Sequence, residues 1–571
     1  MKMNQFMNQF LNQKRKYGRT GLKNFYFLIG IFLFLIYFFF FNFFKKENSL
    51  NKKKIELFKK ELIKNNLIKT QELKKIKEIK EIKEKEVIIE NNVLKLSLST
   101  IGGNIKNLFL KKNPNISIET ENFSLLKENS SLFGLEFTNK FGKKIETYKL
   151  EFIPEIKEDL FKYTINMHAQ LEPNVSIDYV YVVYKGNNYY IDFFIKSKGL
   201  SEYVSKNSLN FEWSQKILNL EKEKTIEKKY TNISFRINSK KNKINFFDKK
   251  KYSFKELDNL YWIANKQQFF ASILCFKNQL TIDNSKKILI YSENINSDSE
   301  LKFSELKIPF LLKKEEELNC DYKWYFGPLD YHILKQSKDG FEQIIPFGKG
   351  IAKVLNRYFF LNLFELFEKA NINSGIIIIL MTIVVKLLLS PITYSQYKFN
   401  FFMQNFFMQN FLMQTKFFLN PQILIEFYKK IGINPIYSLL GNMIQIPIFY
   451  SLMNFFPTLI NLRGKRFLWA KNLSYSDRIL NLNFNIPIYG NHISLFNIFN
   501  ILILFVFTKI RNRKKFSKTN RIYILFYIMM LFFFNNYPSG IYIYYISSNI
   551  INILFYSLID FYFQEFKIPI I

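Results

Sequence analysis

Cysteine and histidine are scarce in this chain of 571 residues, which contains two cysteines and three histidines. Cys275 and Cys320 form no CxxC pair, and the histidines are far apart in the sequence, so we expect no metal site and no cofactor. Paired carboxylates in a recognisable catalytic setting are also missing, which argues against an enzyme. Whether the two cysteines form a disulfide stays open, because spacing does not show proximity.

Acidic residues are few relative to basic ones, 47 against 82, which gives a formal net charge of +35. Such an excess is typical of nucleic-acid-binding proteins. The lysines are nevertheless spread along the chain without a recognisable RNA- or DNA-binding motif. Lys, Asn, Ile, Phe and Tyr are all abundant, as AT-rich codons alone would produce. We therefore expect no specific nucleic-acid partner.

The first long hydrophobic run covers residues 25–44, enough for one helical crossing of a membrane core of ~30 Å. Basic residues precede it in segment 1–24, and no small-x-small cleavage site follows, which favours a retained anchor over a signal peptide. The N-terminus then stays in the cytoplasm and the following chain is exported. Residues 45–90, rich in Ile, Lys and Glu, are predicted to be a solvated tether.

Residues 91–340 contain no further run of membrane length. Short segments of alternating apolar and polar residues are separated there by turn signals such as Gly186-Asn187-Asn188, which predicts half-buried strands. About 240 residues of this pattern indicate a large periplasmic β-sandwich domain. A carbohydrate-binding role is compatible with that fold, but a fold alone does not assign a function.

Residues 341–370 change to a helical period. Ile351, Val354, Leu355 and Tyr358 share one face, and a polar face opposes them with Lys349, Lys353, Asn356 and Arg357. One interpretation is a surface helix packed on the β domain. We favour an amphipathic helix at the outer membrane–water boundary.

Five further apolar runs follow within residues 371–571, at 374–392, 436–456, 492–508, 522–537 and 540–558. The strongly basic loop 509–521 is predicted to be cytoplasmic, and counting crossings from a cytoplasmic N-terminus gives the same answer. The C-terminus is then cytoplasmic too. Loop 457–490 is also basic, although the count places it outside. The fold class is thus an α-helical polytopic protein of the cytoplasmic (inner) membrane, with six transmembrane helices and a periplasmic β-sandwich.

Lys386 lies inside the second crossing, where a lysine at the bilayer centre costs about 2.5–3.5 kcal/mol on insertion scales. One explanation is snorkelling toward an end of the crossing near Ile392. The other is a wet cavity, because Thr382 shares its face and nearby crossings carry Gln445, Tyr544, Tyr545, Ser548 and Asn549. A transporter or channel with Lys386 as an anion site is a further alternative, although no inverted repeat or broken helix supports it.

Three membrane motifs are distinctive: "TIVVKLLLSPIT", "GINPIYSLLGNMIQIPIFYSL" and "NNYPSGIYIYYISSNI". Three exported motifs accompany them: "STIGGNI", "YWIANKQQFFASI" and "WYFGP". In order and spacing they resemble the YidC family of membrane-protein insertases, in the long bacterial form with a periplasmic β domain. The resemblance spans nearly the whole chain from residue 20.

The resemblance implies an insertase and chaperone that makes and breaks no covalent bond. Its basic residue lies in a hydrophilic groove that is open to the cytoplasm and to lipid but closed outside. By position, Lys386 is the groove cation, and the polar groove or substrate contacts are Thr382, Gln445, Tyr544, Tyr545 and Ser548. Phe449 and Met453 would form a hydrophobic slide. Many members have arginine at the cation position, and lysine favours point-charge attraction over bidentate binding.

The same resemblance implies the partners and one further element. Nascent membrane proteins are the expected substrates, with the Sec translocon and membrane lipids as further partners. Residues 394–435 would form a cytoplasmic helical hairpin. Because the chain lacks the basic tail of some relatives, any ribosome contact is expected at loop 509–521.

Overall fold

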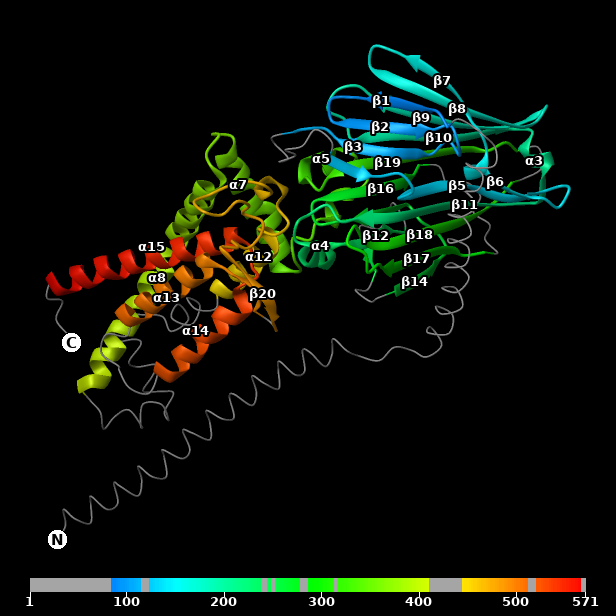
Figure 1. Cartoon of the computed structure of the whole chain (residues 1–571). Helices are drawn as coiled ribbons and strands as arrows, with labels where there is room; N and C mark the ends of the chain where they lie inside the picture. Colours follow the sequence, from blue (N-terminus) through cyan, green and yellow to red (C-terminus); the bar gives the residue numbers. More distant parts are fainter. Residues whose placement is uncertain are drawn as a thin grey trace, which may run out of the picture. The chain divides into compact units, whose positions relative to one another are not determined.

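The computed structural model describes residues 84–113, 123–237, 244–247, 252–277, 286–312, 316–409, 444–487, 489–511 and 520–565. The predicted cytoplasmic segment 1–24, the first crossing 25–44 and most of the tether lie outside these residues. β-sheets occupy the first part of the described chain, and apolar helices dominate the second part (Figure 1).

A four-stranded antiparallel sheet opens the β domain, in the order β1-β2-β3-β4. Its strands are β1 (Glu86–Glu90), β2 (Leu94–Ser99), β3 (Ile105–Leu110) and β4 (Phe123–Leu126). The tether prediction was wrong over 86–90, because Val87 and Ile89 are buried while Glu86 and Glu90 are exposed. Exposed and buried positions alternate there with the period of a strand, and the exposed central position is Ile88.

Two larger antiparallel sheets complete the domain. The nine-stranded sheet runs β13 (Asn245–Phe246), β12 (Asn232–Arg236), β15 (Trp262–Lys266), β16 (Phe270–Phe276), β19 (Asn319–Pro328), β10 (Tyr190–Lys198), β9 (Val175–Tyr184), β8 (Lys162–Glu172), β7 (Ile153–Glu158). The six-stranded sheet runs β14 (Tyr252–Leu257), β17 (Ile288–Asn294), β18 (Glu300–Leu311), β11 (Val204–Leu218), β5 (Ser131–Asn139), β6 (Lys144–Glu146).

Aromatic side chains join the two larger sheets face to face. The rings of Trp213 on β11 and Trp324 on β19 meet edge-on at 4.9 Å. Phe211 stacks on Tyr322 at a centroid distance of 5.3 Å. Large inward-facing rings bury apolar area between the sheets and hold them together, as expected for sheet-on-sheet packing.

The two cysteines do not form a disulfide. Both are buried thiols on neighbouring strands, and burial raises the pKa of each. The strand register places Cys275 opposite Lys323 and Cys320 opposite Ile195, so the two residues are not cross-strand partners.

The helical elements follow the β domain. They are α5 (Tyr331–Gln336), η3 (Phe341–Ile344), α6 (Ile351–Val354), η4 (Leu355–Phe360), α7 (Leu361–Glu368), α8 (Ser374–Gln409), α12 (Gln445–Phe455), α13 (Leu495–Arg511), α14 (Asn520–Phe534) and α15 (Ser539–Glu565). Short helices α3 (Leu200–Tyr203), α4 (Lys224–Tyr230), η2 (Thr147–Lys149) and η6 (Ile460–Leu462) and the hairpin β20 (Leu480–Ile486) and β21 (Gly490–Ile493) complete the fold.

Each predicted crossing after the first contains a helix, but the helix lengths differ. Within the described residues, Ser374–Tyr397 and Ser539–Ile559 are long and apolar enough to cross a membrane, whereas α13 and α14 are shorter apolar helices. The described part of the third crossing is α12, since residues 436–443 lie outside the description. The helices at either side of the predicted loop 509–521 extend into it, to Arg511 and from Asn520.

Helix α8 continues beyond Ile392, the predicted end of the second crossing, to Gln409. Pro391 has no N–H for the carbonyl of Leu387, which would normally receive it. The hydroxyl of Ser390 donates to that carbonyl instead, at 2.8 Å. The helix therefore passes through the proline and includes the first part of the predicted hairpin 394–435; residues 410–435 lie outside the description.

The predicted amphipathic segment is helical from Ile351 to Glu368, with a π-helical stretch at η4. Ile351 and Tyr358 are 67% and 62% exposed, whereas Leu355 packs against the core. Asn356 is fully buried and donates to the carbonyls of Phe347 and Ser451, both at 2.8 Å. Asn356 thus attaches the segment to α12, whereas Ile351 and Tyr358 of the apolar face point outward.

Candidate functional site

Lys386 joins two of the long apolar helices. Its ammonium, on α8, donates a hydrogen bond of 3.0 Å to the Oδ1 atom of Asn552 on α15. The two residues lie about 18 Å and about 20 Å along their helices from Ser374 and Ser539, at 1.5 Å per residue. Among the described residues, no carboxylate forms an ion pair with Lys386. An amide satisfies one of the three donors of the ammonium and leaves its charge uncompensated.

Aromatic residues surround the start of α15. The ring of Tyr545 lies 5.4 Å from that of Tyr544 and 5.3 Å from that of Phe449 on α12. Phe449 also contacts Phe534 of α14 at 5.7 Å. These contacts bring Phe449 of the predicted slide against Tyr545 of the predicted polar set.

Three buried polar atoms in these helices have no hydrogen-bond partner among the described residues. They are the hydroxyl of Tyr545 and the Oδ1 atoms of Asn497 and Asn500 on α13. Buried polar atoms are almost always satisfied in proteins, so each such atom needs an explanation. Polar groups of a bound molecule or water are the ordinary partners in such a position.

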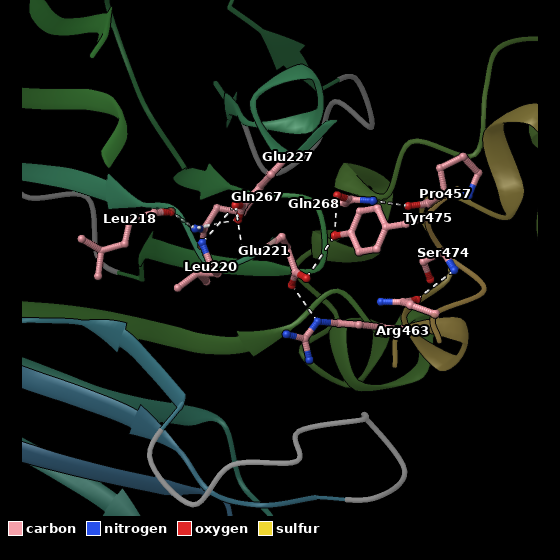
Figure 2. Close-up of polar contacts among 11 residues, drawn as sticks. Leu218, Leu220, Glu221, Glu227, Gln267, Gln268, Pro457, Arg463, Ser474 and Tyr475 are labelled. Atoms are coloured by element: carbon pink, nitrogen blue, oxygen red, sulfur yellow. Dashed lines mark hydrogen bonds and ion pairs between the residues drawn. The ribbon is translucent and has the colours of Figure 1, made fainter. Parts of the chain in front are cut away.

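A second polar cluster lies where the β domain contacts the loop after α12 (Figure 2). Arg463 Nε donates to Glu221 Oε1 at 2.6 Å, and the hydroxyl of Tyr475 donates to Glu221 Oε2 at 3.0 Å. The same hydroxyl lies 3.2 Å from Gln268 Oε1, and Gln268 Nε2 donates to the carbonyl of Pro457 at 2.8 Å. We call this set the loop junction; it consists of Glu221, Gln268, Pro457, Arg463 and Tyr475.

Glu227, on α4, supports the loop junction from inside the β domain. It is fully buried, and its Oε2 accepts the backbone N–H groups of Leu220 and Glu221 at 2.9 and 3.0 Å. Burial raises the pKa of Glu227 to about 8, and burial also raises the pKa of Glu221 despite Arg463. Glu227 therefore fixes the backbone that leads into Glu221, the residue to which Arg463 bonds.

Comparison with known proteins assigns the family. The family described as "YidC periplasmic domain" matches residues 86–361, beginning where β1 begins. The family described as "60Kd inner membrane protein" matches residues 366–565, which include Lys386 and Asn552. The chain belongs to the YidC family.

Individual YidC proteins agree with this assignment. The chain is 28% identical over 492 residues to the membrane protein insertase YidC of Parabacteroides distasonis, covering 81% of this chain and 76% of that protein. It is 29% identical over 497 residues to that of Phocaeicola vulgatus, with the same coverage. A crystal structure of an active YidC insertase is similar at 15% identity and a TM-score of 0.29, covering 82% of this chain and 92% of that one.

The other predicted site residues of this YidC-family chain have the following positions. Thr382 is fully buried, and its hydroxyl donates to the carbonyl of Ile378 in its own helix at 2.8 Å. Gln445 is exposed at the first turn of α12, and Ser548 is buried on α15. Met453 packs partly against the core. The roles of these residues stay predictions.

Three polar residues of the helices were missed by the sequence reasoning. Asn552 was overlooked although it is four residues after Ser548 and hence on the same helical face. Asn497 and Asn500 were overlooked because they lie in a strongly apolar run. An asparagine inside such a run is itself a usable signal, since polar residues in membrane helices usually face protein or water.

Proposed function

We propose that this YidC-family chain inserts nascent membrane proteins into the cytoplasmic membrane and helps them fold, without covalent chemistry. The observation that carries the proposal is the ammonium of Lys386, which bonds an amide oxygen of α15 rather than a carboxylate. Because the amide is neutral, the positive charge of Lys386 remains available to an anionic group of a client. The family of the chain and the names of its relatives support the same function.

The mechanism rests on lowering the cost of moving a short polar tail part-way across the membrane. Lys386 would attract acidic residues of that tail, by about 4 kcal/mol for charges 4 Å apart at an effective dielectric constant of 20. The unpartnered atoms of Tyr545 and Asn500 would hydrogen-bond backbone groups of the tail, which are costly to bury alone. The client helix would then leave along Phe449 and Met453 into lipid.

The short helices α13 and α14 would reduce the distance that the tail travels. With 17 and 15 residues they span about 26 and 22 Å, less than the ~30 Å of a typical hydrocarbon core. A membrane thins locally around helices that are too short for it. Thinning shortens the apolar layer next to Lys386.

The proposed topology has six crossings, with residues 25–44 as the first and both termini in the cytoplasm. Loop 457–490 departs from the rule that basic loops are cytoplasmic, because counting the crossings places it outside. Arg463 and Arg478 of that loop pair with Glu221 and Glu223 of the β domain. The acidic partners on the β domain neutralise these arginines, which supports placing the loop on the same side of the membrane as that domain.

We also propose that the segment Ile351–Glu368 lies on the outer membrane surface. Ile351, Val354, Tyr358 and Leu366 are all more than half exposed, which supports lipid as their neighbour. Packing of this apolar face on the β domain, the simpler interpretation, leaves those side chains unexplained. The Sec translocon, and a ribosome at loop 509–521, are proposed as further partners on the family resemblance.

Reconstitution tests the proposed function. The full chain in liposomes would receive a small single-span client whose exported tail carries either two aspartates or two asparagines, and protease protection would measure insertion. The parent should insert both clients above empty liposomes, and Lys386→Ala should reduce insertion of the aspartate client most. Insertion by the parent no better than by empty liposomes would contradict the proposal and favour the transporter alternative, with Lys386 as an anion site.

A further inference from the structure

The segment Tyr475–Arg478 contacts both the β domain and the start of α13. The hydroxyl of Tyr475 contacts Glu221 and Gln268, and Arg478 pairs with Glu223, so both of these side chains reach the β domain. Between them, Asp477 turns the other way. Its carboxylate accepts from the backbone N–H of Phe496 at 2.9 Å and from the hydroxyl of Ser494, at the start of α13.

The backbone of the same segment holds the start of α15. The carbonyl of Tyr475 accepts two hydrogen bonds from Ser539, one from its N–H and one from its hydroxyl, both at 2.7 Å. Just before it, the carbonyl of Leu473 accepts from the N–H of Gly540 at 3.0 Å. A Cβ at Gly540 would be in ordinary van der Waals contact with that carbonyl, at 3.4 Å.

The start of α8 is held by the same loop. Asn373 Nδ2 donates to the carbonyl of Arg466 at 3.2 Å. A Cβ at Gly375 would overlap the ring of Phe467, so the first turn of α8 has room only for glycine there. One loop therefore contacts the first turns of α8, α13 and α15 and is itself bonded to the β domain.

We propose that Tyr475–Arg478, together with Arg463, is a positioning element through which the β domain sets the exported ends of α13 and α15. Because α8 and α15 meet at Lys386 and Asn552, a change at the loop junction would alter how these two residues meet. The element would act on insertion through the position of these helices, so its role there is indirect and rests on the proposed function. Its effect on helix position does not depend on that function.

The chemistry of the loop junction suits a rigid connection. Glu221 is 6% exposed and Gln268 is 1% exposed, so water does not compete for their hydrogen bonds. The Tyr475 ring also meets Phe269 edge-on at 6.4 Å, and the Arg463 guanidinium lies 4.9 Å from the ring of Phe123. Removal of one polar partner would leave another buried without compensation.

A thiol reporter tests the proposal, because Cys275 and Cys320 are both fully buried. Ser548→Cys, on α15, would be alkylated by a membrane-permeant maleimide in the full-length protein. Tyr475→Phe keeps the ring and removes both hydroxyl contacts. Both Tyr475→Phe and Glu221→Gln should change the alkylation rate of the introduced cysteine by about threefold or more. Arg463→Lys, which keeps the charge, should stay nearer the parent.

The matched control is Glu212→Gln, another buried acid-to-amide change, whose carboxylate accepts from Lys307 inside the six-stranded sheet. It should leave the rate at the parent's value. Equal rates in the parent, Tyr475→Phe and Glu221→Gln would overturn the proposal, as would an equal change in Glu212→Gln. If the reconstituted insertion assay fails while the reporter responds, the proposed function is wrong and the positioning element stands.

Discussion

Arg463 Nε lies 2.6 Å from Glu221 Oε1, which ties the loop after α12 to a carboxylate that is almost completely buried in the β domain. Breaking a buried pair by removing one partner leaves an uncompensated charge and typically costs about 3–5 kcal/mol. Arg463→Met should therefore lower the unfolding free energy by about that amount. Denaturant unfolding of the full chain in detergent, followed by tryptophan fluorescence, measures it.

The double variant Arg463→Met with Glu221→Gln provides the control for this prediction. With the acid neutralised, no buried charge is left alone, so part of the lost stability should return. A loss below about 1 kcal/mol in Arg463→Met would show that the pair behaves like an exposed surface pair.

Glu227 predicts a pH dependence of stability. Its folded pKa of about 8 lies above the ordinary glutamate value of 4.5, so the folded state holds its proton more tightly than the unfolded state. The stabilisation is complete below pH 4.5 and is lost as the pH rises toward 8, by at most about 1.4 kcal/mol per pH unit. Glu221, whose pKa is also raised, acts in the same direction.

Glu227→Gln removes this titration and keeps an oxygen for the N–H groups of Leu220 and Glu221. Melting temperatures of parent and variant, measured from pH 5 to pH 9, should diverge as the pH rises, with the variant the more stable at pH 8. Parallel curves of melting temperature against pH would mean that the pKa of Glu227 is not raised in the folded state.

Asn356 predicts a local stability effect. It is fully buried and donates to two carbonyls, one on each side of the contact between η4 and α12. Asn356→Ala leaves both carbonyls without this donor and should cost about 1–3 kcal/mol. The matched control is Asn362→Ala, whose exposed amide bonds only Tyr358 of its own helix. Similar unfolding free energies for the two variants would contradict the anchoring role.

The outward apolar face of α6 and η4 predicts contact with lipid. A nitroxide on Val354→Cys should show the high oxygen and low nickel-complex accessibility of a lipid-exposed site in a bilayer. A nitroxide on Leu160→Cys, at an 86% exposed position of the β domain, should show the opposite pattern. Water-like accessibility at both positions would reject the interfacial helix.

Local periodicity made much of this fold predictable from the sequence. Strands such as β8 alternate between buried and less buried positions over much of their length, and the apolar runs that became α8 and α15 are long and continuous. The tether prediction failed at Glu86–Glu90 because its charges concealed a period of two. The continuous helix from the second crossing into the predicted hairpin was not foreseen, because the hydrogen bond of Ser390 beside Pro391 is a contact that composition does not reveal.

The site was predictable only in part, since its contacts join distant parts of the sequence. Lys386 was found because a charge inside an apolar run is conspicuous, but its partner Asn552 lies 166 positions further along. Glu221 and Arg463, 242 positions apart, looked like ordinary members of two unrelated charged stretches. No local pattern distinguishes a buried carboxylate from an exposed one, so the loop junction needed the structure.

The most direct test of the central claim is complementation in bacterial cells depleted of their own insertase. The full chain would be compared with Lys386→Ala, Lys386→Arg and Asn552→Ala, and with Ser557→Ala, at an exposed polar position of α15, as the control. Growth should be rescued by the parent, Lys386→Arg and Ser557→Ala, be lost with Lys386→Ala, and be weakened with Asn552→Ala. Full rescue by Lys386→Ala at equal membrane levels would contradict a working cation at this position and return Lys386 to snorkelling.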